Sequence, residues 1–282
     1  MEIEEHRVGM DGMSVRYLCV GSGPSLLLLH GAGGSSSEWR WLMSELSGAW
    51  RVLAPDMPPA SGGNGMRELY APEDSVEFIL SFLRAVRVAR TVVAGHCTGG
   101  LSAVCLSLQK QDLVRALVLI DSGGLGQAIH PAMIMEASPL WGDLAVRLAS
   151  TPVGAMHRAL FRSLLLYSRP DRAPKQWWIQ QYRLALEPGF LRASLGALRS
   201  STGPLGQTRI FLDRLPELAM PVLLLWGSMD QVVPGYQALE ARGRLRDGRL
   251  AFIPDCGHLP HVEKPDLCAR EIGGFAAEAL HA

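Results

Sequence analysis

Residues 91–100 have the sequence Thr91-Val-Val-Ala-Gly95-His-Cys97-Thr-Gly99-Gly100. A short apolar run typical of a buried strand is followed by Gly-x-Cys-x-Gly and then by a segment of helical character. A strand that turns this tightly into a helix strains the central residue, and side chains beside it would obstruct the turn, so glycine is needed on both sides. The pattern predicts that Cys97 is presented at a helix N-terminus, where the helix dipole favours a thiolate.

Short apolar runs bounded by Gly, Pro or Asp alternate with longer segments of helical period on both sides of this turn. Such alternation is typical of a largely parallel sheet covered by helices. The predicted strands span residues 14–20, 26–29, 51–54, 91–94, 117–120, 222–226 and 250–253. The predicted helices span residues 39–46, 75–86, 100–109, 237–244 and 265–280.

About a hundred residues separate Asp121, after one predicted strand, from Val222 at the start of the next. Helical periodicity and repeated prolines in this interval indicate an inserted helical cap. We therefore predict a core over residues 1–125 and 206–282 and a cap over residues 126–205. A cap inserted here lies over the carboxyl ends of the strands, so some of its apolar side chains are expected to contact a substrate. The candidates are Trp141, Met156 and Trp178.

The composition narrows the class of protein. The chain has 282 residues, of which 48% are hydrophobic, enough to bury a sizeable core. Basic and acidic residues number 27 each with no basic block, which argues against a nucleic-acid or anionic-membrane partner. Five cysteines without a C-x-x-C pair argue against a disulfide framework and a zinc site. No secretory signal or membrane-spanning apolar run is visible, so we expect a cytoplasmic protein.

Three further segments accompany the turn at Cys97. They are Leu26-Leu-Leu-Leu-His30-Gly-Ala32-Gly-Gly34, Leu223-Leu-Leu-Trp226-Gly-Ser-Met-Asp230-Gln-Val-Val-Pro234 and Pro254-Asp-Cys-Gly257-His258-Leu-Pro260-His-Val-Glu263-Lys-Pro265. Together the four segments resemble the α/β-hydrolase superfamily, in which Gly-x-Ser-x-Gly forms the nucleophile elbow. The resemblance covers nearly the whole chain outside the predicted cap. It implies an α/β fold with a mostly parallel eight-stranded sheet flanked by helices.

The resemblance assigns a role to each segment. It implies that Cys97 is the nucleophile, His258 the general base and Asp230 the acid that orients the imidazole. The backbone N–H groups of Ala32 and Thr98 would face the oxyanion of a tetrahedral intermediate. No metal and no organic cofactor are expected, since no phosphate-binding Gly-x-Gly-x-x-Gly follows a first strand.

Alternatives remain open at several of these positions. Asp121, at the end of the strand before the predicted cap, is a second candidate for the acid. His261 lies near His258 in sequence but is more typical of a structural residue. Cys256 is two residues from His258 and lacks the elbow. Two other interpretations of Cys97 remain: an inert cysteine in a glycine-rich turn, or an engineered replacement of serine.

The chain departs from the family pattern in two places. Cysteine replaces the usual serine, and residues 54–64 keep the family's Pro-Asp but disturb the Gly-x-Gly that commonly follows, which predicts a different pocket wall. A thiolate is a better leaving group than an amide nitrogen or a simple alkoxide, so adducts with such groups mostly revert to substrate. Thioesters, activated esters and strained lactones avoid this reversal because their own leaving groups compete with sulfur.

We therefore expect a Cys-His-Asp enzyme that forms a thioester acyl-enzyme and then hydrolyses or transfers the acyl group. Its partner is a small-molecule acyl substrate with a largely apolar or aromatic part, free or bound to a carrier or to CoA. Two other functions stay open. One is a carbon–carbon bond hydrolase of the meta-cleavage-product type, which shares the Gly-Gly after the elbow and the cap. The other is a ligand-binding receptor of the same fold with little turnover.

Overall fold

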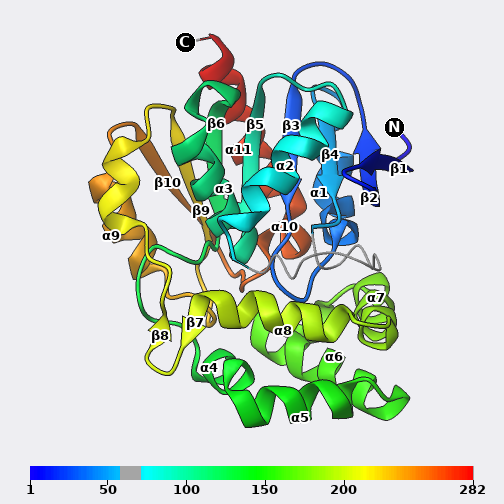
Figure 1. Cartoon of the computed structure of the whole chain (residues 1–282). Coiled ribbons are helices and arrows are strands. Elements are labelled where there is room, and N and C mark those ends of the chain that lie inside the picture. Colours follow the sequence, from blue (N-terminus) through cyan, green and yellow to red (C-terminus); the bar gives the residue numbers. More distant parts are fainter. Residues whose placement is uncertain (58–70, 282) are drawn as a thin grey trace.

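The fold is built on one eight-stranded sheet. The computed structural model describes residues 1–57 and 71–281, and its strands lie in the order β1-β2-β4-β3-β5-β6-β9-β10 (Figure 1). β2 pairs antiparallel with β1 and with β4, whereas every other neighbouring pair is parallel. The predicted mostly parallel eight-stranded sheet is confirmed. Its strands are β1 (Glu4–Met10), β2 (Met13–Val20), β3 (Ser25–Leu29), β4 (Arg51–Pro55), β5 (Thr91–His96), β6 (Val114–Ile120), β9 (Val222–Gly227) and β10 (Gly248–Ile253).

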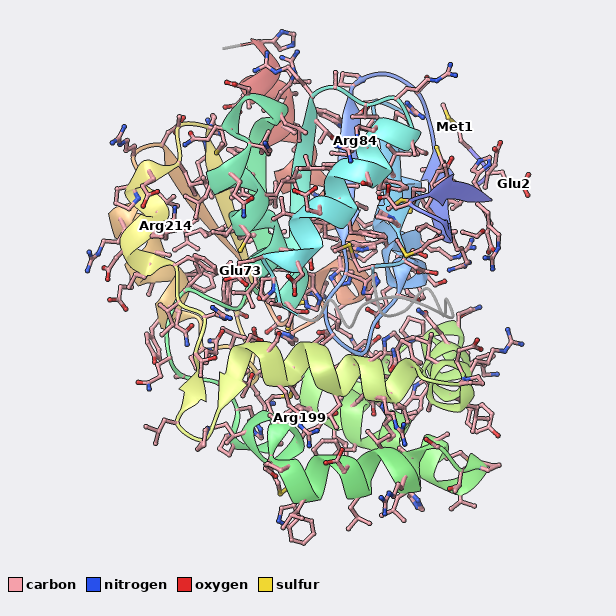
Figure 2. All side chains as sticks on the ribbon, viewed as in Figure 1. Met1, Glu2, Glu73, Arg84, Arg199 and Arg214 are labelled. Atoms are coloured by element: carbon pink, nitrogen blue, oxygen red, sulfur yellow. The ribbon has the colours of Figure 1, made fainter. Side chains whose placement is uncertain are left out.

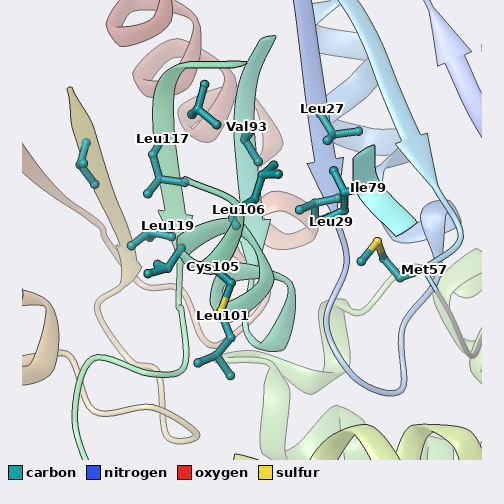
Figure 3. Packing of buried hydrophobic residues seen from close by; sticks show 14 of the residues in the cluster. Leu27, Leu29, Met57, Ile79, Val93, Leu101, Cys105, Leu106, Leu117 and Leu119 are labelled. Atoms are coloured by element: carbon teal, nitrogen blue, oxygen red, sulfur yellow. The ribbon is translucent and has the colours of Figure 1, made fainter. Parts of the chain in front are cut away.

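Helices cover both faces of this sheet. One face packs on α1 (Arg40–Leu46) and α11 (Pro265–His281), and the other packs on α2 (Asp74–Ala85), α3 (Thr98–Gln109) and α9 (Tyr236–Arg244). The central strands are apolar along their whole length because both of their faces are buried. Figure 3 shows the packing on one face, where Leu101, Cys105 and Leu106 of α3 lie close to strand side chains such as Leu119. The described residues also hold short 3-10 helices and one short α-helix: η1 (Ser36–Trp39), η2 (Gln111–Leu113), η4 (Leu212–Glu217) and α10 (Pro260–Glu263) in the core, and η3 (Pro170–Arg172) between α6 and α7.

One strand of the sheet was missed by sequence reasoning. β1 pairs with β2 from Glu4 opposite Cys19 to Met10 opposite Met13, so a two-residue loop joins them. Asp11 and Gly12 in that loop both have positive φ, 49° and 77°, as a type I′ hairpin turn requires. Only Met10 of this edge strand is buried, which explains the weak hydrophobic pattern.

Five helices lie between β6 and β9, at the end of the sheet where β3 and β5 terminate (Figure 1). They span residues 131–201, inside the interval 126–205 predicted as a cap, and the proposed division into core and cap stays a prediction. Arg199 ties these helices together, since its guanidinium donates to the carbonyl oxygens of Ala137 and Ser138 and to the carboxylate of Asp143 (Figure 2). The helices are α4 (Pro131–Ala137), α5 (Pro139–Ala149), α6 (Pro152–Leu166), α7 (Lys175–Leu186) and α8 (Phe190–Ser201), followed by the two-residue strands β7 (Thr202–Gly203) and β8 (Gly206–Gln207).

The unusual loop over residues 54–64 lies largely outside the described residues. Its described part is bonded to the loop after β3. Asp56 accepts hydrogen bonds from the backbone N–H of Ser36 at 2.8 Å and from Arg16 Nη1 at 2.9 Å. His30 Nε2 accepts from the backbone N–H of Met57 at 2.9 Å. These bonds give His30 and Asp56 structural roles.

Candidate active site

Cys97 occupies a strained turn between β5 and α3. Its φ of 52° and ψ of −116° lie outside the conformations that L-residues readily adopt. A Cβ atom on Gly95 would lie 2.4 Å from the carbonyl oxygen of Gly99, and one on Gly99 would lie 2.2 Å from that of Leu29. Both glycines are therefore required, and the close turn leaves the Cys97 side chain partly exposed at the start of α3.

The loops after β9 and β10 bring Asp230 and His258 together. Asp230 Oδ1 accepts the backbone N–H groups of Val232 and Val233 at 2.7 and 3.2 Å, which turns Oδ2 toward His258 Nδ1 at 2.8 Å. The backbone of His258 is also held, because its N–H donates to the carbonyl oxygen of Leu166 at the end of α6. The imidazole is thus held by Asp230, and the backbone that carries it is held by the end of α6.

The protonation behaviour of His258 follows from its neighbours. Burial alone would lower the pKa of this imidazole, but the Asp230 carboxylate and hydrogen bonds to Asp230 and Cys97 raise it well above the ordinary value. Because Nδ1 bonds Asp230, Nε2 is the ring nitrogen left for the Cys97 thiol. The three side chains form a chain from thiol to imidazole to carboxylate, an arrangement that can take the proton from the thiol and stabilise the resulting imidazolium.

Asp121, the alternative acid, lies near this chain but bonds elsewhere. Its Oδ1 accepts the backbone N–H of Gly227 at 2.8 Å, and its Oδ2 is buried without a hydrogen-bond partner among the described residues. Burial and the nearby charge of Asp230 raise the pKa of the Asp121 carboxyl well above its ordinary value, so this group favours its neutral form. Asp230, not Asp121, contacts the ring nitrogen of His258.

The loop after β3, which holds the candidate oxyanion donor Ala32, packs directly on Cys97. A Cβ atom on Gly31 would lie 2.9 Å from Cys97 Cβ, so the loop approaches as closely as a glycine allows. Ala32 and Thr98, the two candidate donors, both line a cavity of about 50 Å³ beside the elbow. The backbone N–H of Ala32 is already engaged, since it donates to Thr98 Oγ1 at 2.8 Å. Sequence reasoning did not foresee this bond.

Two further histidines pack behind His258. His96 lies 4.8 Å from His258 and 4.7 Å from His261 between ring centroids, and His96 Nε2 donates to the carbonyl oxygen of His258 at 2.7 Å. Burial, followed by the charges of the neighbouring histidines, lowers the pKa of His96 well below its ordinary value. Burial, followed by the charge of His258, lowers the pKa of His261 to about 3. Both rings are therefore neutral supports for the backbone and ring of His258.

One group of side chains in the described part of the chain has the spacing of metal ligands. Single ligand atoms of His96, Asp121 and His258 lie within 4.8 Å of one another. A metal there would compete with the contact between His258 and Cys97, because the other nitrogen of His258 bonds Asp230. The geometry fits a cation poorly and fits proton transfer well.

A much larger cavity, of about 580 Å³, lies among α4, α5, α6 and α8. Trp141, one of the three predicted substrate contacts, lines it and is 64% exposed. Met156 is also 64% exposed, and Trp178 packs edge-to-face on Trp177 with centroids 5.8 Å apart. Among the described residues, neither Met156 nor Trp178 lines this cavity or the smaller one, and contact of any of the three with a substrate stays a prediction.

Comparison with known proteins agrees with the fold. The Alpha/beta hydrolase family matches residues 26–271, so the chain belongs to the α/β-hydrolase family. It is similar to a pimeloyl-[acyl-carrier protein] methyl ester esterase of Nitrosomonas europaea, with 28% identity over 90% of this chain and 96% of that protein. It is also similar to a 2-hydroxy-6-oxo-6-(2'-aminophenyl)hexa-2,4-dienoic acid hydrolase of Metapseudomonas resinovorans, with 26% identity over 93% of this chain and 87% of that protein.

Solved structures show the same fold. The epoxide hydrolase CorEH superposes with a TM-score of 0.82 at 22% identity, covering 98% of this chain and 99% of that one. The family match and these relatives support a hydrolase. None of the helices within residues 1–57 and 71–281 has the length and apolar character needed to cross a bilayer.

Proposed function

We propose that the chain is an acyl-bond hydrolase or acyltransferase in which Cys97 is the nucleophile, His258 the general base and Asp230 the orienting acid. The observation that carries the proposal is the contact of 2.8 Å between His258 Nδ1 and Asp230 Oδ2, which leaves the other ring nitrogen of His258 for the thiol of Cys97. The placement of Cys97 on a strained turn at the N-terminus of α3 supports a reactive thiolate.

The reaction proceeds in two halves. His258 takes the thiol proton as Cys97 Sγ attacks the carbonyl carbon, and the carbonyl electron pair moves to oxygen, where the backbone N–H groups of Ala32 and Thr98 stabilise it. The intermediate collapses, the leaving group departs with the proton held by His258, and a thioester acyl-enzyme remains. Water or another acceptor then gives a proton to His258, attacks the thioester and releases Cys97.

Cysteine favours substrates whose leaving group competes with sulfur, namely thioesters, activated esters and lactones. The apolar lining of the large cavity supports an acyl part that is apolar or aromatic, free or attached to a carrier or to CoA. None of these steps needs a cofactor. All five cysteines are unpaired, which supports a reducing compartment such as the cytoplasm.

Intact-mass spectrometry tests this function most directly. The protein is incubated with a panel of acyl thioesters, aryl esters and lactones, and product release is followed in parallel. We expect a mass increase equal to one acyl group on the parent protein and none on Cys97→Ala. A saturable single acylation without turnover would instead indicate a receptor, and acylation of Cys97→Ala would contradict the assigned nucleophile.

A carbon–carbon bond hydrolase is the second candidate function. It is favoured by the similarity to the dienoic acid hydrolase over 93% of this chain. Cysteine disfavours it, because a carbanion-like group leaves less easily than sulfur. Turnover of a vinylogous diketone in preference to an aryl thioester would select this candidate.

A further inference from the structure

Two arginines of α6, one helical turn apart, converge on the oxyanion loop. A Cβ atom on Gly33 would lie 2.6 Å from Arg162 Nη1 and 3.1 Å from Arg158 Nη2. Gly33 has a φ of 74° and directly follows Ala32, the candidate oxyanion donor. Both guanidinium groups therefore lie against the loop beside Cys97, and the positive φ of Gly33 favours glycine at this position.

The same arginines face the large cavity. Arg158 and Arg162 both line the space of about 580 Å³ among the inserted helices, whereas Gly33 lines the small space beside Cys97. Ser194 of α8 lines both spaces, so the two cavities adjoin. Arg158 and Arg162 therefore lie where the two cavities meet, between the large cavity and the candidate catalytic residues.

The positive charge of the pair is poorly matched by the protein. Neither arginine has a carboxylate within ion-pair distance among residues 1–57 and 71–281, and Arg162 Nε is buried without a hydrogen-bond partner. Arg158 Nη1 donates to Gln181 Oε1 at 3.1 Å, a neutral acceptor, and Gln181 Nε2 in turn donates to Glu38 Oε1 at 3.0 Å. Both arginines are half-buried, and a buried donor without a partner is costly, so the site favours an added anion.

The nearby acids do not supply that anion. Burial raises the pKa of Glu38 to about 7 against the opposing charge of Arg162, so part of this carboxyl is protonated at neutral pH. Glu136 also lines the large cavity and attracts Arg158, but it forms no ion pair with it among the described residues. Burial and then the charge of Arg162 lower the pKa of Arg158 to about 9, which still leaves it cationic at pH 7.

We propose that Arg158 and Arg162 bind an anionic group of the substrate, a carboxylate or a phosphate, while the apolar remainder occupies the cavity among α4, α5, α6 and α8. Two planar guanidinium groups match either anion through paired N–H donors. The substrate is then an amphiphilic anion whose charge lies close to the reacting carbonyl. The position of the charge close to the reacting carbonyl rests on the proposed function, because that function places the carbonyl at Cys97.

Calorimetric binding to the Cys97→Ala protein tests the subsite without requiring turnover. The probes are octanoate, octyl phosphate and octanamide, which share one apolar chain. We expect both anions to bind more tightly than octanamide, and the tighter of the two identifies the headgroup. Arg162→Gln and Arg158→Gln should each weaken anion binding by roughly ten- to a hundredfold, as expected for charge-assisted hydrogen bonds, and leave octanamide unchanged.

Two further variants keep the test decisive. Arg147→Gln removes an exposed charge from α5 and should change nothing. Arg162→Lys keeps the charge but loses the paired N–H donors of the guanidinium, so its affinity for the anions should lie between those of the Arg162→Gln and Cys97→Ala proteins. This variant also carries the test if Arg162→Gln fails to fold. Equal binding of octanoate and octanamide, or an equal loss in Arg147→Gln, would overturn the subsite. Anion binding without any acylation of Cys97 in the parent protein would instead defeat the proposed catalytic function and leave the subsite standing.

Discussion

The backbone N–H of Ala32 donates a hydrogen bond to Thr98 Oγ1 at 2.8 Å. The two residues proposed to stabilise the oxyanion are thereby bonded to each other, across 66 positions of the chain. A substrate oxyanion has to replace the Thr98 hydroxyl before the Ala32 N–H can act on it. Thr98 therefore opposes the formation of the oxyanion site in which its own backbone N–H takes part.

The first prediction is that Thr98→Val increases kcat/KM for a thioester several-fold. Valine has nearly the same shape but cannot accept the Ala32 N–H, and one neutral hydrogen bond is worth about 1 kcal/mol, or roughly fivefold. Steady-state kinetics measure the change, with Thr98→Ser as a control that keeps the hydroxyl and the parental rate. A loss of activity in Thr98→Val would mean that the hydroxyl assists the reaction.

The second prediction is that Cys97 is alkylated first. Limiting iodoacetamide at neutral pH, followed by peptide mass spectrometry, should find the label on Cys97, because burial raises the pKa of Cys105 to about 12 and also raises the pKa values of Cys256 and Cys268. His258→Ala should slow this labelling, since the imidazole no longer takes the proton. Earlier labelling of Cys256 or Cys268 would contradict the assigned nucleophile.

The third prediction separates the two candidate acids. Asp230→Asn should reduce kcat strongly, though less than His258→Ala, because the acid of a triad has the smaller separate effect. Asp121→Asn should leave kcat nearly unchanged, since asparagine keeps the acceptor for the Gly227 N–H and the carboxyl it replaces already favours its neutral form. The assignment fails if Asp121→Asn is the more damaging of the two.

Much of the candidate site was readable from the sequence because each residue follows an apolar strand in a loop rich in glycine. Cys97 follows β5, Asp230 follows β9 and His258 follows β10, and the carboxyl ends of parallel strands meet at one edge of a sheet. Local sequence therefore carried the order and the approximate position of the three groups. The sequence favoured Asp230 over Asp121 although both follow strands at that edge, and the structure adds that Asp230 is the carboxylate that contacts His258 Nδ1.

Long-range contacts explain what sequence reasoning missed. Arg158 and Arg162 are four residues apart in a helical segment, a spacing that is equally typical of a solvated face, and only the fold brings them against Gly33. β1 was not predicted because only Met10 of this strand is buried, so its sequence shows little alternation of apolar and polar residues. The Asp11-Gly12 pair between Met10 and Met13 was nevertheless a hairpin signal.

The fourth prediction concerns stability in acid. The folded pKa of His261 is lowered to about 3, so between pH 3 and 6.5 the unfolded chain binds a proton that the folded chain does not. His261 thus costs stability progressively as the pH falls below about 6.5, by roughly 3 kcal/mol at pH 4.5. Both ring nitrogens lack hydrogen-bond partners among the described residues, and the ring lies 4.3 Å from Trp39 between centroids, so phenylalanine is a fitting replacement.

Urea unfolding of His261→Phe at pH 7.5 and 4.5 measures this effect. We expect the free energy of unfolding to fall less between the two pH values in the variant than in the parent protein. His281→Phe, on the exposed end of α11, is the matched control and should follow the parent. An equal acid loss in parent and His261→Phe would show that this histidine is not the source.

The last prediction tests the thiol itself through Cys97→Ser. Serine places a more basic oxygen on the elbow, and that nucleophile depends wholly on His258 for deprotonation. The variant should keep the fold and lose at least about tenfold in kcat/KM for thioesters, or roughly 1.4 kcal/mol of transition-state stabilisation.

Substrates should differ in how much they lose. Transfer to an amine or thiol should suffer most, because it uses the leaving ability of sulfur in the acyl-enzyme. Simple ester hydrolysis should survive or improve, since an ester acyl-enzyme releases its acyl group readily to water activated by His258. Parallel kinetics with a thioester and the matched alkyl ester separate these effects. A faster turnover of every substrate by Cys97→Ser would mean that cysteine restrains catalysis here, and a ligand-binding role with little turnover would then explain the site better.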